Sequence, residues 1–290
     1  MKKKSLLRTL RISLIYVFFI SLHALGQGSY FSFSGGYGIK MGSQNILTPP
    51  SVLAQDEDFP STFTNDVYGA SNLTSEQINL SLGSGLNFGL NFGHMLTPNF
   101  GFDLGVNYLL GSPTKAVTTS GTFAFEQSIQ ASMLRLLPGI VVLGNGNYYQ
   151  RTIPYAKLGC AIGFGSLNYQ VTEPVSKLDM EVVYDGGSPF GLFAGFGFSH
   201  KISDRISLVG EINTFNLTYS PKGGEVTKLK AEDIDFLPSL DVSEREIEFV
   251  DTFSDLPQSP TQPLRALSRR FPMGSVGVNL GIKICLGNQF

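Results

Sequence analysis

Charged residues are scarce in this chain, where Asp, Glu, Lys and Arg together make up 15% of 290 residues. The net charge is -2, and neither sign is concentrated enough to suggest a nucleic acid partner. The two cysteines, Cys160 and Cys285, are too few for a disulfide framework. We therefore set aside nucleic-acid-binding proteins and disulfide-stapled domains.

Long apolar runs are absent beyond the N-terminus: no stretch of 18 or more apolar residues follows residue 26, so we expect no transmembrane helix there. Residues 1–26 are predicted to be a cleaved secretory signal peptide, because basic residues precede an apolar run from Ile12 to Leu25 that contains small residues near its end. The alternative is a retained anchor helix, but that run has 14 residues, whereas a membrane span needs about 20. An exported chain that crosses a membrane without helices must form a closed barrel.

Glycine and phenylalanine are abundant instead, with 33 and 23 copies. They alternate with a period of two, which is typical of a strand with two different faces. Between Ile78 and His94 the even positions, except Ser84, carry apolar residues and the odd positions carry Gly, Asn or Ser. A soluble sandwich would place Lys, Glu and Thr on its outward face, whereas Gly, Ser and Asn suit a narrow lumen.

Eight such segments predict an all-β fold, a transmembrane antiparallel up-and-down β-barrel with hydrocarbon outside. A change of phase near Met133 to Leu136 suggests a bulge in the fourth segment. The segments are about Tyr30–Met41, Ile78–His94, Phe100–Tyr108, Gln127–Val142, Ala156–Phe164, Phe190–Phe198, Ile206–Thr218 and Val276–Leu286.

The connections between these segments alternate in length. Outer-membrane barrels have short periplasmic turns and longer extracellular loops, so residues 96–99, 144–152 and 203–204 are expected to be periplasmic. The longest extracellular loops are expected at about 42–77 and 221–271, and together with the barrel they complete one domain over residues 27–290. Partial alternation within the last loop leaves a hairpin beyond the membrane as one option.

Charged residues at inward positions form a candidate lumen network. By strand parity they are Lys40, Asp103, Arg135, Lys157, Glu211 and Lys283. One interpretation is a gated ion path. The other, which we prefer, is that opposite charges pair and fill the lumen, because an eight-stranded barrel is only wide enough for its own side chains.

Catalytic, metal-binding and cofactor-binding residues are not evident. His94 and His200 lie next to predicted periplasmic turns and lack spaced partners, so we expect interfacial residues, and no enzyme and no cofactor. Cys285 is predicted to point inward and Cys160 outward, which disfavours a bridge between them.

The chain resembles the small outer-membrane β-barrel proteins of Bacteroidota, the OmpA-like and OmpX-like barrel group. The resemblance rests on the signal peptide ending near Gln27, on the Gly/Asn/Phe alternation, and on the closing segment Phe271 to Lys283 ahead of Phe290. It implies a location in the outer membrane, contact with its lipid, and a C-terminal aromatic, Phe290, read by the outer-membrane assembly machinery.

Two functions stay open, because a barrel fold hosts many roles. The preferred one is a structural or interaction barrel that presents its long loops to a surface protein or glycan partner. The alternative is a narrow, porin-like channel or an accessory component of an envelope transport or secretion system.

Overall fold

The structure, a computed structural model, describes residues 28–42, 44, 46–50, 63–68, 73–120, 123–144, 151–252 and 259–286. The predicted signal peptide at residues 1–26 and Phe290 lie outside these ranges. No helix of the described residues is long and apolar enough to span a membrane.

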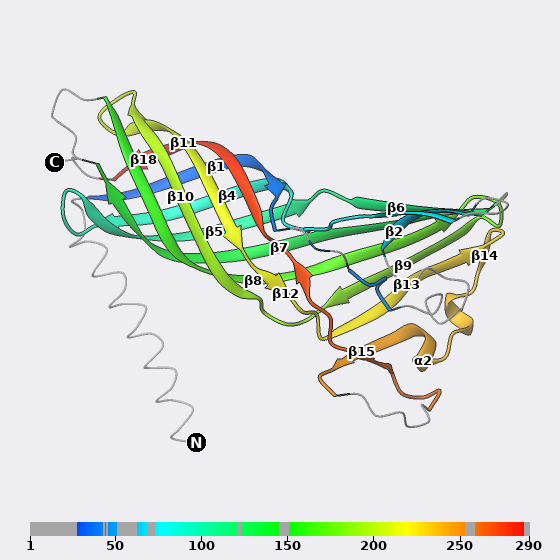
Figure 1. The fold of residues 1–290 in the computed structure, drawn as a ribbon. Coiled ribbons are helices and arrows are strands. Elements are labelled where there is room, and N and C mark those ends of the chain that lie inside the picture. The colour runs from blue at the N-terminus through cyan, green and yellow to red at the C-terminus, as the bar shows by residue number, and fades with distance from the viewer. Residues whose placement is uncertain are drawn as a thin grey trace, which may run out of the picture.

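Eight antiparallel strands close into a barrel, as predicted (Figure 1). Each barrel strand pairs with its neighbours along the chain, and β1 pairs with both β4 and β18, which closes the ring. The eight strands are β1 (Ser29–Lys40), β4 (Gly85–Met95), β5 (Phe100–Gly111), β7 (Phe123–Leu143), β8 (Thr152–Glu173), β10 (Phe190–Lys201), β11 (Ile206–Asn216) and β18 (Ser275–Cys285).

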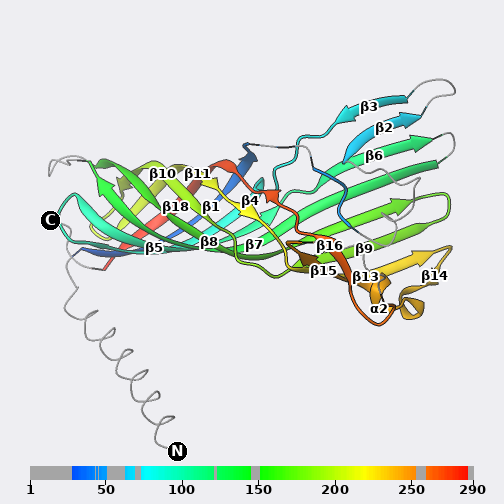
Figure 2. The same ribbon diagram turned by 60° about the horizontal axis from the view of Figure 1, so that its bottom comes forward.

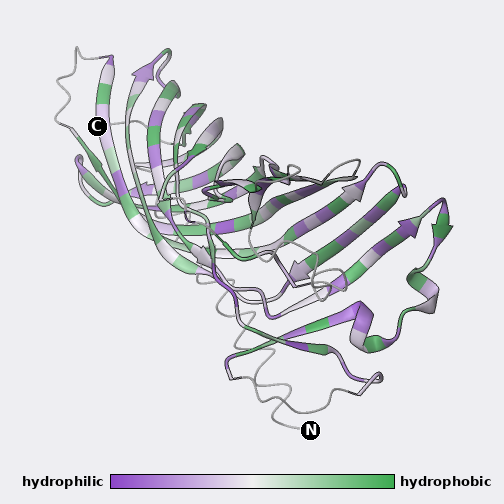
Figure 3. Ribbon diagram, turned by 45° about the vertical axis from the view of Figure 1, so that its right-hand side comes forward, coloured by the Kyte–Doolittle hydropathy of each residue, from purple (hydrophilic) through white to green (hydrophobic). Residues whose placement is uncertain are grey.

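The outer wall of the barrel is apolar. Outward positions alternate with polar or small inward ones along each strand, a pattern that Figure 3 shows as bands of contrasting hydropathy. In β5, for example, Phe102, Leu104 and Val106 are exposed, whereas Asp103 and Asn107 on the opposite face are buried. Such a cylinder is stable only where hydrocarbon replaces water outside.

Strands β7 and β8 are 21 and 22 residues long, whereas a membrane-spanning strand needs about 9–11 residues. Their far halves leave the barrel and form the centre of an open sheet, in the order β3-β2-β6-β7-β8-β9-β13-β15-β16, which we call the lobe (Figure 2). Its further strands are β2 (Thr64–Tyr68), β3 (Leu73–Gln77), β6 (Thr114–Ser120), β9 (Leu178–Asp185), β13 (Gly223–Ala231), β15 (Glu246–Val250) and β16 (Leu264–Leu267).

The two longest connections, at about 42–77 and 221–271, therefore contain strands of the lobe. The second one holds β13 and β15, which pair antiparallel at residues 223–225 and 246–248. It also holds β14 (Ile234–Asp235), the 3-10 helix η2 (Leu237–Ser239) and the short helix α2 (Val242–Arg245). A separate two-stranded ladder joins β12 (Thr218–Tyr219) to β17 (Phe271–Pro272).

An apolar core fills the base of the lobe above the barrel. Tyr169 and Val171 of β8, Val182 of β9 and Val226 of β13 are all fully buried on one face of the sheet. Tyr184 belongs to the same core and donates a hydrogen bond to the carbonyl of Pro50. The strands of the lobe thus share a hydrophobic face, and packing on that face holds the sheet to the barrel.

Two details of the predicted strands are wrong. The segment from Ile78 does not run on to His94 as one strand, because β4 begins at Gly85, and Leu80 and Leu82 are buried in the lobe core instead of facing lipid. The bulge expected near Met133 is absent, since β5 and β7 pair in unbroken register. The inward residues Met133 and Leu137 of β7 are apolar because they pack against the core of the lobe. Apolar residues on both faces of the strand had therefore looked like a change of phase in the sequence.

We expect Gly85→Ala to destabilise the barrel. Gly85 has a φ of 140°, and an added Cβ would overlap the carbonyl oxygen of Leu110, so the substitution should cost at least about 1 kcal/mol. The matched control is Gly210→Ala, whose Cβ would meet only Leu280 Cδ2, at 3.7 Å. Urea-induced unfolding in detergent micelles or vesicles measures both, and equal midpoints for the two variants would contradict this reading of Gly85.

Candidate functional site

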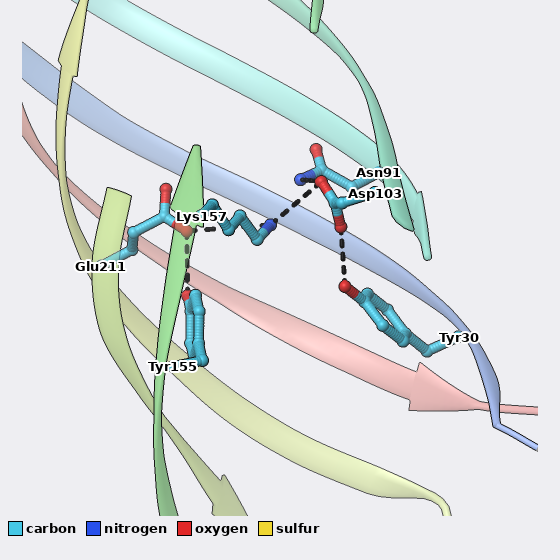
Figure 4. Close-up of polar contacts among 6 residues, drawn as sticks. All are labelled: Tyr30, Asn91, Asp103, Tyr155, Lys157 and Glu211. Atoms are coloured by element: carbon cyan, nitrogen blue, oxygen red, sulfur yellow. Dashed lines mark hydrogen bonds and ion pairs between the residues drawn. The ribbon is translucent and has the colours of Figure 1, made fainter. Parts of the chain in front are cut away.

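The candidate site is a polar network inside the barrel, near the end with the short turns. Its centre is Asp103 of β5, whose side chain is 1% exposed (Figure 4). Tyr30 donates a hydrogen bond to Asp103 Oδ2 at 2.7 Å and Asn91 donates one to Oδ1 at 3.0 Å. Lys157 Nζ lies 3.3 Å from the same Oδ1. The carboxylate is thus balanced by one cation and two neutral donors drawn from β1, β4 and β8.

Lys157 connects this carboxylate to a second one. Its Nζ is 3.8 Å from Glu211 Oε2, which also accepts a hydrogen bond from the hydroxyl of Tyr155 at 3.0 Å. Figure 4 shows Lys157 lying between Asp103 and Glu211. The ammonium therefore bridges opposite sides of the barrel, and the strands that carry these residues come from separate parts of the chain.

Lys283 of β18 joins the network through a ring rather than a carboxylate. Its Nζ lies 4.4 Å from the centroid of Tyr30, the residue whose hydroxyl is bonded to Asp103. A cation over an aromatic face is stabilised by the ring quadrupole, which matters most where water is excluded. The network thus contains two lysines and two carboxylates, so its formal charges balance.

Arg135 forms a second, separate polar cluster further along the lumen. Its guanidinium donates to the side-chain oxygens of Asn87 and Asn107, and its Cζ lies 3.9 Å from the ring centroid of Phe215. No carboxylate pairs with it among the described residues, although Arg135 is only 1% exposed. Two amides and one aromatic face therefore compensate this buried charge.

A small cavity of about 50 Å³ lies between the network and Phe215. It is lined by Lys157, Glu211 and Asn107, and by Phe193 and Phe215, whose rings stack at 6.2 Å. Such a volume accommodates only a few water molecules. Phe193 and Phe215 already belong to the apolar core of the lobe, which therefore begins on this side of the cavity.

The six charged residues predicted for the lumen do not all meet. Asp103, Lys157, Glu211 and Lys283 lie together in the network, and Arg135 lies apart from them. Lys40 is exposed at the far end of β1, where its Nζ donates to the carbonyl of Asn79 at 3.2 Å.

Two members of the network were not among the predicted residues. Tyr30 and Tyr155 occupy inward positions, so strand parity alone would have included them. Tyr30 was missed because only charged side chains were counted. Tyr155 was missed also because β8 begins at Thr152, earlier than the predicted segment.

The remaining candidates have local partners only. His94 Nδ1 lies 3.0 Å from Ser29 Oγ and His200 Nδ1 lies 2.8 Å from Thr152 Oγ1. Cys285 is buried and Cys160 is partly exposed, and no disulfide joins them. The described ranges hold no group of three or more His, Cys, Asp or Glu that could bind a metal ion.

Comparison with known proteins also identifies a membrane β-barrel. A family profile described as outer membrane protein beta-barrel domain matches residues 16–236. The chain belongs to this family. It is therefore a small β-barrel protein of the cell outer membrane, and its apolar wall contacts lipid. The lobe lies at the end of the barrel opposite the short connections β4–β5 and β10–β11.

Solved structures of small barrels resemble the chain at low identity. Neisserial surface protein A is 8% identical, with 89% of this chain and 97% of that one covered and a TM-score of 0.33. OprG from Pseudomonas aeruginosa is 10% identical over 89% and 95%, with a TM-score of 0.42, and Ail from Yersinia pestis is 10% identical over 89% and 100%, with a TM-score of 0.29. No curated protein matches. None of these matches bears on the source lineage, so membership of Bacteroidota stays a prediction.

We expect Asp103→Asn to lower the stability of the folded barrel by about 3 kcal/mol, because it leaves Lys157 buried with only the more distant Glu211. Adding Lys157→Met should recover part of that loss, since the unpaired charge is then removed. Lys115→Gln is the control, because the Lys115–Glu126 pair is exposed and contributes little. Urea unfolding of the four proteins tests this. A loss for Asp103→Asn no larger than for the control would show that the network does not stabilise the barrel.

Proposed function

We propose that this protein is a structural barrel that holds a rigid extracellular sheet, the lobe, for recognition of a protein partner at the cell surface. The observation that carries the proposal is the continuity of β7 and β8, which run unbroken from the barrel wall into the lobe and pair with each other along both parts. A sheet built on the strands of the barrel itself cannot swing as a flexible loop would. Pre-organised surfaces of this kind bind partners at a lower entropic cost.

The outer face of the lobe is polar and cross-linked by ion pairs. Lys228 of β13 pairs with Asp179 of β9, and Lys115 pairs with Glu126 at 2.5 Å. Partial burial on its own would raise the pKa of Asp179, but hydrogen bonds from Lys228 and Gln170 lower it overall, so this carboxylate stays ionised at neutral pH. These pairs fix neighbouring strands to each other but offer few unsatisfied groups to a ligand.

The free edge of the lobe is a better candidate for the contact. Strand β3 is the last described strand on one side of the sheet, and all five of its residues are exposed. Val67, Tyr68 and Leu73 expose apolar side chains at the β2–β3 hairpin. An unpaired strand edge with apolar side chains favours a protein that adds a strand or packs on the hairpin, rather than a glycan.

Export and assembly complete the proposal. We infer that residues 1–26 direct secretion and are removed, and that Phe290 ends the signal for the outer-membrane assembly machinery. No enzymatic activity and no cofactor are proposed.

The channel alternative has no specific support. The ion-paired network, the 50 Å³ cavity and the stacked Phe193 and Phe215 succeed one another along the lumen and leave little room for hydrated ions. We therefore expect no discrete conductance steps in planar bilayers, with a known porin as the positive control. Steps that change on substitution of Lys157 or Glu211 would instead support transport.

We expect Leu73→Asp to abolish binding of the partner. The test is photo-crosslinking in intact cells from a reactive amino acid at Thr74, followed by mild detergent extraction. A supporting result is one crosslinked protein that is lost in Leu73→Asp and retained in Val175→Asp, since Val175 is equally apolar and more exposed but lies between β8 and β9. Unchanged crosslinking in Leu73→Asp, or no crosslinked protein at all, would contradict recognition at this edge.

A further inference from the structure

A recess of about 550 Å³ lies on the outside of the barrel, at the extracellular end of β10 and β11. Phe190 of β10 lines one side of the recess, and the hydroxyl-bearing residues Ser188, Thr218 and Ser220 also line it. Arg270, from the segment that leads into β17, also lines the recess, together with Gln44, Pro189 and Pro272. The recess is separate from the lumen network and from the free edge of the lobe.

The outward residues of β11 and β12 show where the recess lies relative to the membrane. Ile206, Leu208 and Ile212 are exposed and apolar, whereas the next outward positions are Thr214, Asn216, Thr218 and Ser220. This change from apolar to polar outward residues marks the end of the hydrocarbon region on this strand, between Ile212 and Asn216, because the lipid-facing band of a membrane barrel is apolar. Thr218 and Ser220, beyond that boundary, stand at the level of the lipid headgroups.

The neighbouring strand keeps an apolar outward face up to the recess. Leu192 of β10 pairs with Asn216 of β11, and both Leu192 and Phe190 are highly exposed. An apolar surface thus borders one side of the recess and hydroxyls line the other. This combination fits a molecule that has an acyl chain and a polar headgroup.

Arg270 supplies a positive charge at this level. It is exposed, and within the described part of the chain it makes no ion pair and no hydrogen bond. Its position is nevertheless well defined, because Thr218 pairs with Pro272 in the ladder of β12 and β17, and Ser220 Oγ donates to the carbonyl of Arg269 at 2.8 Å. The backbone that carries Arg270 is therefore fixed beside a recess whose hydroxyls can also donate hydrogen bonds.

We propose that this recess binds the phosphate group of an outer-leaflet lipid headgroup, with Arg270 as its main ligand. A guanidinium presents paired N–H donors that match two phosphate oxygens, and Ser188 and Thr218 can donate to the others. The acyl chains would then follow Phe190 and Leu192 down the barrel wall. The inference does not depend on the partner proposed for the lobe.

The test is native mass spectrometry of the protein extracted from outer membranes in dodecyl maltoside, with added dilauroyl phosphatidic acid as the probe. Dilauroylglycerol, which has the same chains and no phosphate, is the matched lipid. We expect a phosphatidic acid adduct that dilauroylglycerol does not give and that Arg270→Gln reduces roughly fivefold, since a charge-assisted bidentate contact is lost. Arg270→Lys should retain most of the adduct because it keeps the charge.

Arg265→Gln is the control for charge, because Arg265 is in the same connection but pairs with Glu248 in the lobe. It should leave the adduct unchanged, and heat-dependent gel mobility confirms that each variant is folded. Equal adducts for the wild type, Arg270→Gln and Arg270→Lys would overturn the site. Displacement of phosphatidic acid by an equal concentration of inorganic phosphate would identify a site for a free anion and overturn the assignment to lipid.

Discussion

The structure depends on the closure of one hydrogen-bonded ladder. Within hydrocarbon, an unpaired backbone N–H or C=O costs several kcal/mol, so β1 must pair on both sides, with β18 and with β4. Closure with eight strands leaves a narrow interior, which explains the small inward residues: a Cβ on Gly36 would overlap the side chain of Asn279 from the adjacent strand. The same narrowness requires that every charge inside has a partner within reach.

The two charged clusters of the lumen meet this requirement in different ways. Lys157 lies between Asp103 and Glu211, so cation and carboxylates compensate one another. Arg135 has only amides and the ring of Phe215, yet its side chain sits where the lumen meets the apolar core of the lobe. A planar guanidinium tolerates such surroundings better than an ammonium, because it is weakly hydrated and stacks on aromatic faces. The lumen is thus filled by its own side chains. The surfaces proposed to bind partners, the β2–β3 edge of the lobe and the recess beside Arg270, lie outside it.

Period-2 alternation was sufficient to predict the barrel, the number of its strands and the inward orientation of Asp103, Lys157, Glu211 and Lys283. It could not predict which of these residues are in contact, because parity assigns each residue to the inner or outer face but does not give its position along the barrel axis. Lys40 shows the difference, since it has inward parity but lies beyond the lumen. The lobe was missed for a related reason. Leu80 and Leu82 continue the alternation of β4, but a turn at residues 82–83 and the positive φ of Gly85 separate the core of the lobe from the lipid-facing wall.

Alternation also gives the adjacent residues Arg269 and Arg270 different surroundings. Arg269 points inward and donates to the carbonyl of Thr48, which secures the segment before β2, whereas Arg270 points outward to the recess at headgroup level. Both arginines lie beside β17, whose pairing with β12 ties this segment to the end of β11. Since β7 and β8 continue from the barrel into the lobe, the lobe and the recess are both attached to the barrel wall through paired strands.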